Sequence, residues 1–448
     1  MKNLWRLLFV LVVLSLSSCN QEQKEKADYV LFSGKITNPN GTKVRIKGDN
    51  FKQSIAMKDG VFADTLHIPN DGYYQFSDGR ENTAMYLKKG TKVNITLDTK
   101  EFDETITYTG SDESDFLAKK YMLLENSGLD GRELTEVAAN ELKAKADALK
   151  NDINTLLNKY KLDSTFKANA QKDMAYLTPA TIAKFLAFQG YFYGNKIDGA
   201  AELLKVLDGI DYDNEADFKT SDNYKMLVDI DFMRKTAEAE DLGISHVKTI
   251  KSKTIREHFI KQLGSEINPS NKNLEKDFKA IMAIATDKDF KDKLQAKYDK
   301  FAQLVAGNPS PTFENYENYA GGTTSLTDLK GKYVYIDVWA TWCGPCKREI
   351  PFLQKIEEKY KGKNIHFVSL SIDDKGAHEA WKAMVADKEM SGIQLFAPKD
   401  WKSKFVRDYG IEGVPTFILI DPKGNIVSAS APRPSSEELP ALLDSLLK

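Results

Sequence analysis

The chain has 448 residues, of which 42% are hydrophobic and 10% aromatic, and its formal net charge is -2. This composition supports packed cores and excludes disorder over the whole chain, while the length predicts two or three domains. Since there is neither a basic excess nor a stripe of interleaved basic and aromatic residues, nucleic-acid binding is excluded as the main function.

Residues 1–18 have the pattern of a secretory signal peptide. Lys2 and Arg6 precede the apolar run Leu7–Leu16, which is shorter than the ~20 residues of a membrane-spanning helix. Residues 16–19 read Leu-Ser-Ser-Cys and resemble the bacterial lipobox, whose cysteine is lipidated and becomes the new N-terminus. We therefore expect a lipid on Cys19. An ordinary signal peptide with an incidental cysteine is the alternative.

Residues 19–28 are mostly polar and predict a short tether behind this anchor. The residue after Cys19 is Asn20, whereas the lipobox pattern associates an aspartate there with retention in the inner membrane. We expect a protein of the cell envelope that is lipid-anchored and faces the periplasm, with the outer membrane favoured over the inner.

Residues 29–110 show short alternating runs between turn residues, which predicts an all-β domain in the form of a small sandwich or half-open barrel. The segment Lys43–Lys47 alternates polar and apolar side chains without a break. Asp59-Gly60 lies between two such runs, as does Lys89-Gly90, and this predicts a hairpin at each place.

Residues 111–305 change to helical spacing and predict an α-helical domain. One apolar stripe is formed by Leu142, Ala146, Leu149, Ile153, Leu156 and Tyr160. Such a stripe is typical of helix packing rather than of a cofactor site. His246 and His258 lie in this region without cysteine or carboxylate partners at ligand spacing, so no metal is expected on them.

Residues 306–311 read Ala-Gly-Asn-Pro-Ser-Pro and predict a linker. Strand-like and helix-like segments alternate beyond it, which predicts a C-terminal α/β domain over residues 306–448 with a mainly parallel sheet and an antiparallel edge. The expected strands are 333–339, 365–372, 414–420 and 426–430, and the expected helices are 345–360, 376–388 and 437–447.

The cysteines indicate redox chemistry. Besides Cys19 the chain has only Cys343 and Cys346, which form a C-x-x-C where the strand 333–339 runs into the next helix. The free N–H groups and the dipole at the start of that helix favour the thiolate of Cys343, and Pro345 suits the first helical turn. We expect an exposed Cys343 as the nucleophile and a buried Cys346 one turn later.

Half of a zinc site is the main alternative use of a C-x-x-C. Zinc takes four ligands, this domain has no further cysteine, and neither His366 nor His378 stands at a familiar spacing. We expect no metal and no cofactor.

The region around the cysteines resembles the thioredoxin superfamily. Residues 339–347 read Trp-Ala-Thr-Trp-Cys-Gly-Pro-Cys-Lys, and residues 413–417 read Gly-Val-Pro-Thr-Phe, like the active-site run and the downstream proline loop of that family. Residues 347–351, Lys-Arg-Glu-Ile-Pro, are similar to the membrane-attached TlpA/ResA-like group. The first domain resembles, by its layout, the β-domain of uncharacterised function that precedes thioredoxin modules in bacterial lipoproteins.

The resemblance implies roles for individual residues. Asp337 matches the buried aspartate that manages the proton of the second cysteine, and Glu349 matches a glutamate of similar purpose in the ResA-like group. Family members commonly have one or the other, whereas this chain has both; an exposed Glu349 that offsets neighbouring positive charges is the alternative. Pro415 matches a cis-proline that faces the cysteines. The immediate surroundings of the active site are Trp339, Trp342, Gly344, Pro345, Lys347 and Val414.

The function predicted from these residues is thiol–disulfide exchange. Reduction of the substrate is favoured over its oxidation, because Gly344-Pro345 is the thioredoxin dipeptide. The expected partners are protein disulfides as substrates and a thiol donor of the membrane or envelope. Two alternatives stay open: a thioredoxin-fold peroxidase, and a binding or scaffold lipoprotein whose first 305 residues carry the main function. A peroxidase would need a threonine three residues before the reactive cysteine, and here Thr341 is two residues before it.

Overall fold

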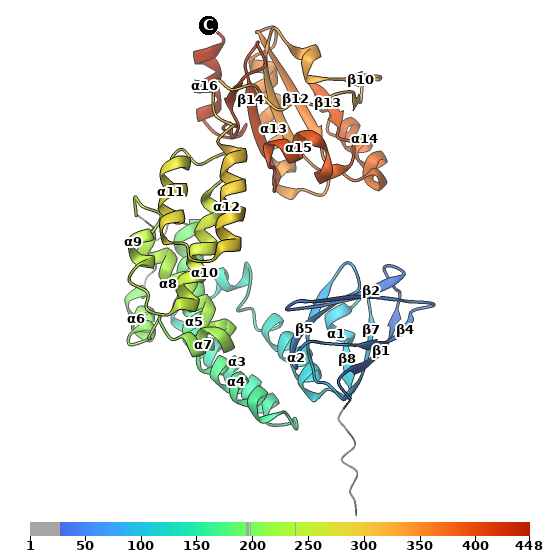
Figure 1. Ribbon diagram of the computed structural model, residues 1–448, viewed down its shortest axis with the longest axis vertical. Coiled ribbons are helices and arrows are strands. Elements are labelled where there is room, and N and C mark those ends of the chain that lie inside the picture. The colour runs from blue at the N-terminus through green and yellow to red at the C-terminus, as the bar shows by residue number, and fades with distance from the viewer. Residues whose placement is uncertain (1–26, 194–196, 198, 238) are drawn as a thin grey trace, which may run out of the picture. The chain divides into compact units, whose positions relative to one another are not determined.

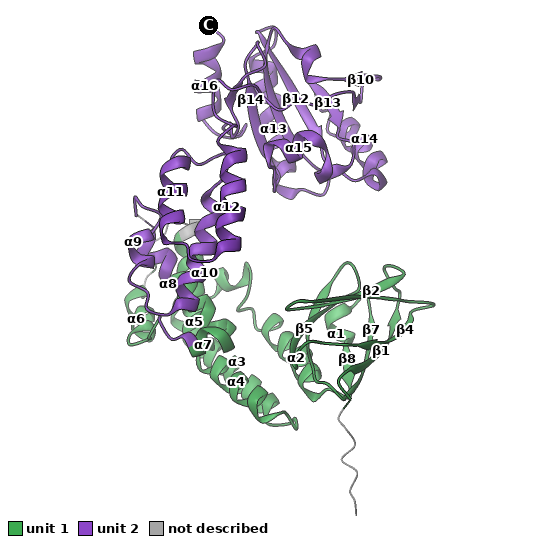
Figure 2. Ribbon diagram, in the orientation of Figure 1, with its two compact units in different colours: residues 1–212, 216–230 green, residues 213–215, 231–448 purple. Residues whose placement is uncertain are grey.

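The computed structural model describes residues 27–193, 197, 199–237 and 239–448. The predicted signal peptide, Cys19 and most of the predicted tether lie outside these residues. The chain divides into two compact units, residues 1–212 with 216–230, and residues 213–215 with 231–448 (Figure 2). This division falls within the helical segment, and the three predicted domain ranges remain a prediction.

The first unit begins with a β-rich region, as predicted (Figure 1). Its strands are β1 (Val30–Thr37), β2 (Lys43–Gly48), β3 (Phe51–Ala56), β4 (Val61–Leu66), β5 (Gly72–Ser77), β6 (Asn82–Leu87), β7 (Lys92–Asp98) and β8 (Thr107–Thr109), with the short helix α1 (Phe102–Thr105) before the last strand. Within the described residues they form two four-stranded sheets, with the orders β4-β1-β7-β8 and β3-β2-β5-β6.

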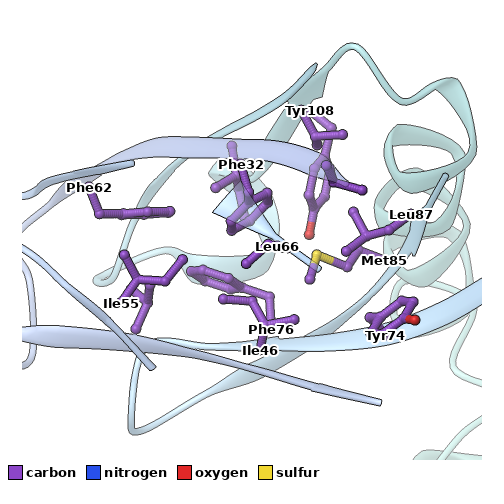
Figure 3. Close-up of a cluster of buried hydrophobic side chains, with 14 of the residues drawn as sticks. Phe32, Ile46, Ile55, Phe62, Leu66, Tyr74, Phe76, Met85, Leu87 and Tyr108 are labelled. Carbon is purple, nitrogen blue, oxygen red and sulfur yellow. The ribbon is translucent and has the colours of Figure 1, made fainter. Parts of the chain in front are cut away.

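Apolar side chains of both sheets meet in one core between them (Figure 3). β1 buries alternate residues, because successive side chains of a strand point to opposite faces. The rings of Phe32 and Phe62 come from one sheet and lie 5.6 Å apart, and Phe76 of the other sheet lies 6.1 Å from Phe62. The region is therefore a small sandwich, one of the two predicted forms.

Of the two hairpins predicted in this region, the one at Asp59-Gly60 exists as a tight turn closed by an antiparallel bridge between Lys58 and Val61, whereas the one at Lys89-Gly90 is wrong. Asp59 and Gly60 adopt positive φ angles of 52° and 76°, as a tight turn requires. However, β3 and β4 belong to different sheets, as do β6 and β7 on either side of Lys89-Gly90. Alternation of apolar residues is the same for a strand that pairs with its neighbour and one that crosses to the opposite sheet, so the pattern could not separate them.

The middle segment is helical, as predicted. Its helices are α2 (Asp112–Glu125), α3 (Ala139–Leu157), α4 (Ser164–Ala175), α5 (Leu177–Tyr193), α6 (Ala200–Leu204), α7 (Glu215–Thr220), α8 (Asp222–Thr236), α9 (Ile244–Val247), α10 (Lys253–Leu263), α11 (Leu274–Ile284) and α12 (Lys288–Phe301). The predicted stripe on α3 is a packing face: Leu142, Ala146, Leu149 and Ile153 are buried in a core with α4 and α5. No helix of the described chain combines the length and apolar character needed to cross a membrane.

The predicted linker is attached to the C-terminal fold by backbone hydrogen bonds. Gly307 N–H donates to the Ile426 carbonyl, the Ile426 N–H donates to the Asn308 carbonyl, and the Ser310 N–H donates to the Gly424 carbonyl. β15 (Ile426–Ser428) is the edge strand of its sheet, and edge strands leave backbone groups open for such pairing.

The C-terminal region has the predicted α/β arrangement. Its sheet has the order β10-β9-β13-β12-β11-β14-β15 within the described residues, parallel between β11, β12 and β13 and antiparallel at both sides of these strands. The elements are β9 (Tyr316–Asn318), β10 (Thr323–Thr324), β11 (Tyr333–Trp339), α13 (Gly344–Lys359), β12 (Ile365–Ser371), α14 (His378–Asp387), β13 (Ile393–Phe396), α15 (Lys404–Tyr409), β14 (Thr416–Ile420), β15 and α16 (Glu438–Leu446).

One face of this sheet carries the helix that begins at the cysteines. Tyr335 of β11 and Phe417 of β14 share a buried cluster with Leu353 of α13 and Leu439 of α16. α13 and α16 therefore cover the same face. Asp337 lies two residues after Tyr335, so its side chain points to this face, towards α13.

Candidate active site

Cys343 and Cys346 form a disulfide bond at the start of α13. Cys343 is the N-cap residue of this helix, and its Sγ accepts the backbone N–H of Cys346 at 3.1 Å. That N–H is one of the helix's unpaired donors, and it would stabilise negative charge on the same sulfur after reduction. Pro345 occupies the first turn, where its missing N–H costs no hydrogen bond.

The prediction that Cys343 is exposed is wrong for this disulfide form. Cys343 is 3% exposed and Cys346 is 2% exposed. The helix-cap position predicts ionisation, but accessibility depends on how closely the proline loop packs on the sulfur, and a sequence motif that places this loop opposite the cysteines does not give that distance.

That loop contains Val414 and Pro415, and the peptide bond between them is cis, as the family resemblance implies. The carbonyl oxygen of Val414 lies 3.6 Å from Cys343 Sγ. Val414 and Pro415 are both partly exposed, so backbone groups next to the sulfur remain open to an incoming chain.

The remaining residues predicted to surround the active site differ in burial. Trp339 is 1% exposed and ends β11, so it belongs to the core. Trp342 is 58% exposed, and its ring centroid lies 6.2 Å from that of the partly buried Trp401. Pro345 and Lys347 are exposed, while Gly344 is partly buried. The disulfide is thus flanked by an accessible aromatic surface.

Asp337 is a buried carboxyl group below the start of α13. It is 3% exposed, and its Oδ1 has no hydrogen-bond partner among the described residues. Burial raises the pKa of Asp337 to about 8, and the nearby carboxylates of Glu349 and Glu357 add to the shift. A group with this pKa can exchange a proton near neutral pH.

Glu349 is also buried, at 7% exposure. It lies one helical turn after Cys346 and therefore on the same side of α13. Its two carboxylate oxygens accept the backbone N–H and the hydroxyl of Ser435, both at 2.9 Å. An exposed Glu349 that only offsets neighbouring charges is excluded by this burial. Cys346, Asp337 and Glu349 thus face one small region between α13 and the sheet.

Asp373 was missed by the sequence analysis. Its side chain is fully buried, and its carboxylate accepts the N–H and hydroxyl of Thr341 at 2.7–3.1 Å and the hydroxyl of Ser371 at 2.8 Å. Thr341 stands two residues before Cys343, so Asp373 anchors the turn that carries the nucleophile. A signal existed: an aspartate directly after a parallel strand lies at the sheet edge where active-site loops gather.

No cluster of three or more histidine, cysteine, aspartate or glutamate side chains suited to a metal ion occurs in the described part of the chain.

Comparison with known proteins adds to this geometry. Residues 305–445 match the Redoxin family. A stretch of 141 residues is 31% identical to the thiol-disulfide oxidoreductase ResA of Bacillus thuringiensis and covers 32% of this chain and 78% of that relative. The chain belongs to the ResA-like thiol–disulfide oxidoreductases of the thioredoxin superfamily.

Other similar proteins carry related names. ResA of Bacillus subtilis is 28% identical over 126 residues, which cover 28% of this chain and 66% of that protein. A crystal structure of the thioredoxin domain of a thiol-disulfide oxidoreductase from Bacteroides vulgatus is 30% identical, with a TM-score of 0.30, and covers 32% of this chain and 99% of that one. The ResA-like similarity thus covers about a third of this oxidoreductase, the part that holds both cysteines.

Proposed function

We propose that this enzyme exchanges two electrons with protein disulfides through Cys343 and Cys346 and works mainly as a reductase. The observation that supports this most is the position of the cysteine pair. Its first sulfur caps α13, accepts the Cys346 N–H, and lies against the loop of the cis-proline. This arrangement places a stabilised Cys343 thiolate directly beside the backbone groups that can bind a substrate chain.

The reaction begins with both cysteines reduced. The Cys343 thiolate attacks one sulfur of the substrate disulfide, a new S–S bond forms, and the other substrate sulfur leaves as a thiolate that takes a proton. Cys346 then loses its proton and attacks Cys343 Sγ, which re-forms the intramolecular disulfide and releases the second substrate thiol. Two electrons have passed to the substrate. An external dithiol donor returns them, because the one other cysteine of the sequence, Cys19, is expected to carry the lipid.

The proton of Cys346 goes to Asp337 in this proposal. A buried thiol ionises with difficulty, and a buried carboxyl group with a pKa near 8 is well matched to accept its proton. Glu349 supports the transfer from one helical turn away, while its hydrogen bonds to Ser435 hold it in place.

We further propose that the enzyme acts in the cell envelope, anchored by a lipid on Cys19 and facing the periplasm. The lipobox-like residues 16–19 and the signal-like residues before them support this location. Asn20 favours the outer membrane over the inner.

Two measurements test the proposal. Alkylation of the reduced protein at pH 6 should label Cys343 far faster than Cys346, since the helix start favours the Cys343 thiolate. Equal labelling would contradict the assignment of the nucleophile. In cells, a Cys346→Ser variant should accumulate covalent complexes with its substrates, and a Cys343→Ser, Cys346→Ser double variant is the matched control that should trap none.

A further inference from the structure

A pocket of about 650 Å³ lies beside the redox disulfide, entirely within the unit of residues 213–215 and 231–448. One wall belongs to the ResA-like fold and includes Pro345, Glu349 and Pro415. The opposite wall comes from the helical segment, which the ResA-like similarity does not cover. It consists of Ser265, Asn268, Pro269, Ser270, Lys297 and Phe301, from the connection between α10 and α11 and from α12.

The two walls are joined by direct contacts. The Ser270 hydroxyl donates to the Ser430 hydroxyl at 2.7 Å. Phe301 is 3% exposed and packs against Gly410 so closely that a Cβ at this glycine would lie 2.4 Å from the ring. The backbone of residues 307–310 is bonded along β15. These side-chain contacts, together with the backbone hydrogen bonds of residues 307–310, hold the helical wall beside the active site.

The cations that line the pocket outnumber its acids. Arg348 and Arg433 both line it, both are exposed, and neither has an ion-pair partner within the described residues. Lys297 adds a third cation from the helical wall, with its Nζ 3.1 Å from the Gly264 carbonyl. Of the two acids in the lining, Glu349 accepts hydrogen bonds from Ser435 and Glu412 is exposed, and within the described residues neither forms an ion pair with these cations. A carboxylate is the natural complement of two unpaired guanidinium groups.

We propose that this pocket binds the polypeptide segment next to the substrate cysteine and that Arg348 and Arg433 pair with an acidic side chain in it. The pocket volume falls within the ~300–1,000 Å³ of small-ligand sites, so it accepts a short segment rather than a folded domain. The helical wall extends recognition beyond the ResA-like fold, with Lys297 as its charged contribution. This inference rests on the proposed exchange at Cys343 and adds the chemistry of the substrate.

The test uses two matched peptides, each with one cysteine activated as a neutral 2-thiopyridyl disulfide. One has aspartate beside the cysteine and the other has asparagine. With the full-length reduced protein, the second-order rate constant should be about five- to tenfold higher for the aspartate peptide. Arg433→Gln should lower this ratio about two- to fivefold, the range of a partly exposed ion pair, and the double change with Arg348→Gln should bring it close to one. The ratio cancels any change in the reactivity of Cys343 itself.

Lys297→Glu tests the helical wall. It should lower the ratio about twofold or more, whereas Lys288→Glu at the start of the same helix and Arg407→Gln in the same fold should leave it unchanged, because neither residue lines the pocket. A wild-type ratio of one, or ratios unaffected by the two arginine changes, would overturn the inference while leaving the exchange reaction intact. Failure of the wild-type protein to reduce even neutral hydroxyethyl disulfide would instead refute the proposed function.

Discussion

Asp337 combines two properties that rarely coexist at one carboxyl group, since it is buried on a strand next to the redox pair and has no hydrogen-bond partner on Oδ1 among the described residues. In the proposed reaction it takes the proton of Cys346. Asp337→Asn should therefore slow turnover about 10- to 100-fold near neutral pH, the low end of general-base contributions. Insulin-reduction assays from pH 6 to 9 measure this effect.

The proposed proton transfer also predicts how the reduction rate depends on pH. The wild-type rate should rise as Asp337 loses its proton around pH 8, and the Asn variant should lack this rise until hydroxide ionises Cys346 without help. The loss caused by the variant should thus grow as pH rises to about 8 and shrink only at higher pH, once hydroxide ionises Cys346. Glu349→Gln should have a smaller effect alone and add to the first change. A double variant with wild-type rates throughout this range would show that neither carboxyl group moves the proton.

The raised pKa of Asp337 also makes the free energy of unfolding depend on pH. An aspartate of the unfolded chain has a pKa of about 3.9, whereas burial raises the pKa of Asp337 in the folded protein to about 8. Between these values the folded state binds more protons, so Asp337 lowers the free energy of unfolding as pH rises from about 4 to 8. Asp337→Asn should remove this decline. Urea unfolding of the oxidised protein can be followed by tryptophan fluorescence, because the tryptophans outside the predicted signal peptide all lie in the C-terminal region. An equal decline in both proteins would contradict the prediction.

Asp373 acts on the site through the turn before Cys343. Asp373→Ala leaves the N–H and hydroxyl of the partly buried Thr341 without their acceptor, which costs up to about 1–3 kcal/mol for each unsatisfied group. We expect a lower free energy of unfolding by fluorescence and slower insulin reduction, with Asp373→Asn less affected because its amide keeps one acceptor. The exposed neighbour provides the control: Asp374→Ala should change the insulin rate little.

Individual residues of the site were predictable where a motif carried them. The two cysteines, Asp337, Glu349 and Pro415 were named from local sequence and lie together around the start of α13, although their catalytic roles remain proposals. Asp373 and Ser435 were not named, because each acts through a contact with a residue 32 or 86 positions away. Arg433 likewise reaches the pocket from a loop whose place only the folded chain defines.

At the scale of elements, periodicity predicted secondary structure better than pairing. The strand expected at residues 333–339 and the helix expected at 345–360 appear as β11 and α13 with almost the same ends. The short elements β9, β10, β13 and α15 were missed, because two to six residues do not show a period. The wrong hairpin at Lys89-Gly90, and the separation of β3 from β4 beyond the Asp59-Gly60 turn, have another cause: a turn reverses the chain without fixing which sheet the next strand enters.

Gly34 offers a test of the β-sandwich core. Its position on β1 faces the core, and a Cβ there would lie 2.5 Å from the Phe62 ring and 2.6 Å from Ile95 Cγ2. The missing side chain thus makes room for the aromatic ring. Gly34→Val should lower the free energy of unfolding of the β-region by about 1–3 kcal/mol, the usual range for overpacking. Circular dichroism during urea unfolding measures it. Gly41→Val is the control, since nothing lies within 4 Å of its added Cβ; equal losses in both variants would contradict the packing argument.

At the scale of the whole molecule, the ResA-like similarity explains residues 305–445 and leaves the first 300 to physical argument alone. Sequence composition predicted a linker at residues 306–311, but the structure bonds this segment to β15. Composition predicts how a segment behaves in isolation. Here the edge strand β15 offers open backbone groups, and the segment is ordered because it forms hydrogen bonds with them. The helical segment can contribute to the active-site pocket because this connection is ordered by hydrogen bonds rather than free.

The anchor is the last feature of the whole molecule to be tested, and it lies outside the described residues. Only Cys19 follows a lipobox-like tripeptide, so the lipid should be on Cys19 and not on Cys343. Several acyl chains hold a protein on a membrane almost permanently, whereas an unlipidated polar tether gives no such hold. Cys19→Ser should therefore yield a soluble exported form or an uncleaved precursor, and Cys343→Ser should remain lipidated and membrane-bound. Fractionation with labelled fatty acid measures both, and normal processing with full membrane attachment of Cys19→Ser would rule the anchor out.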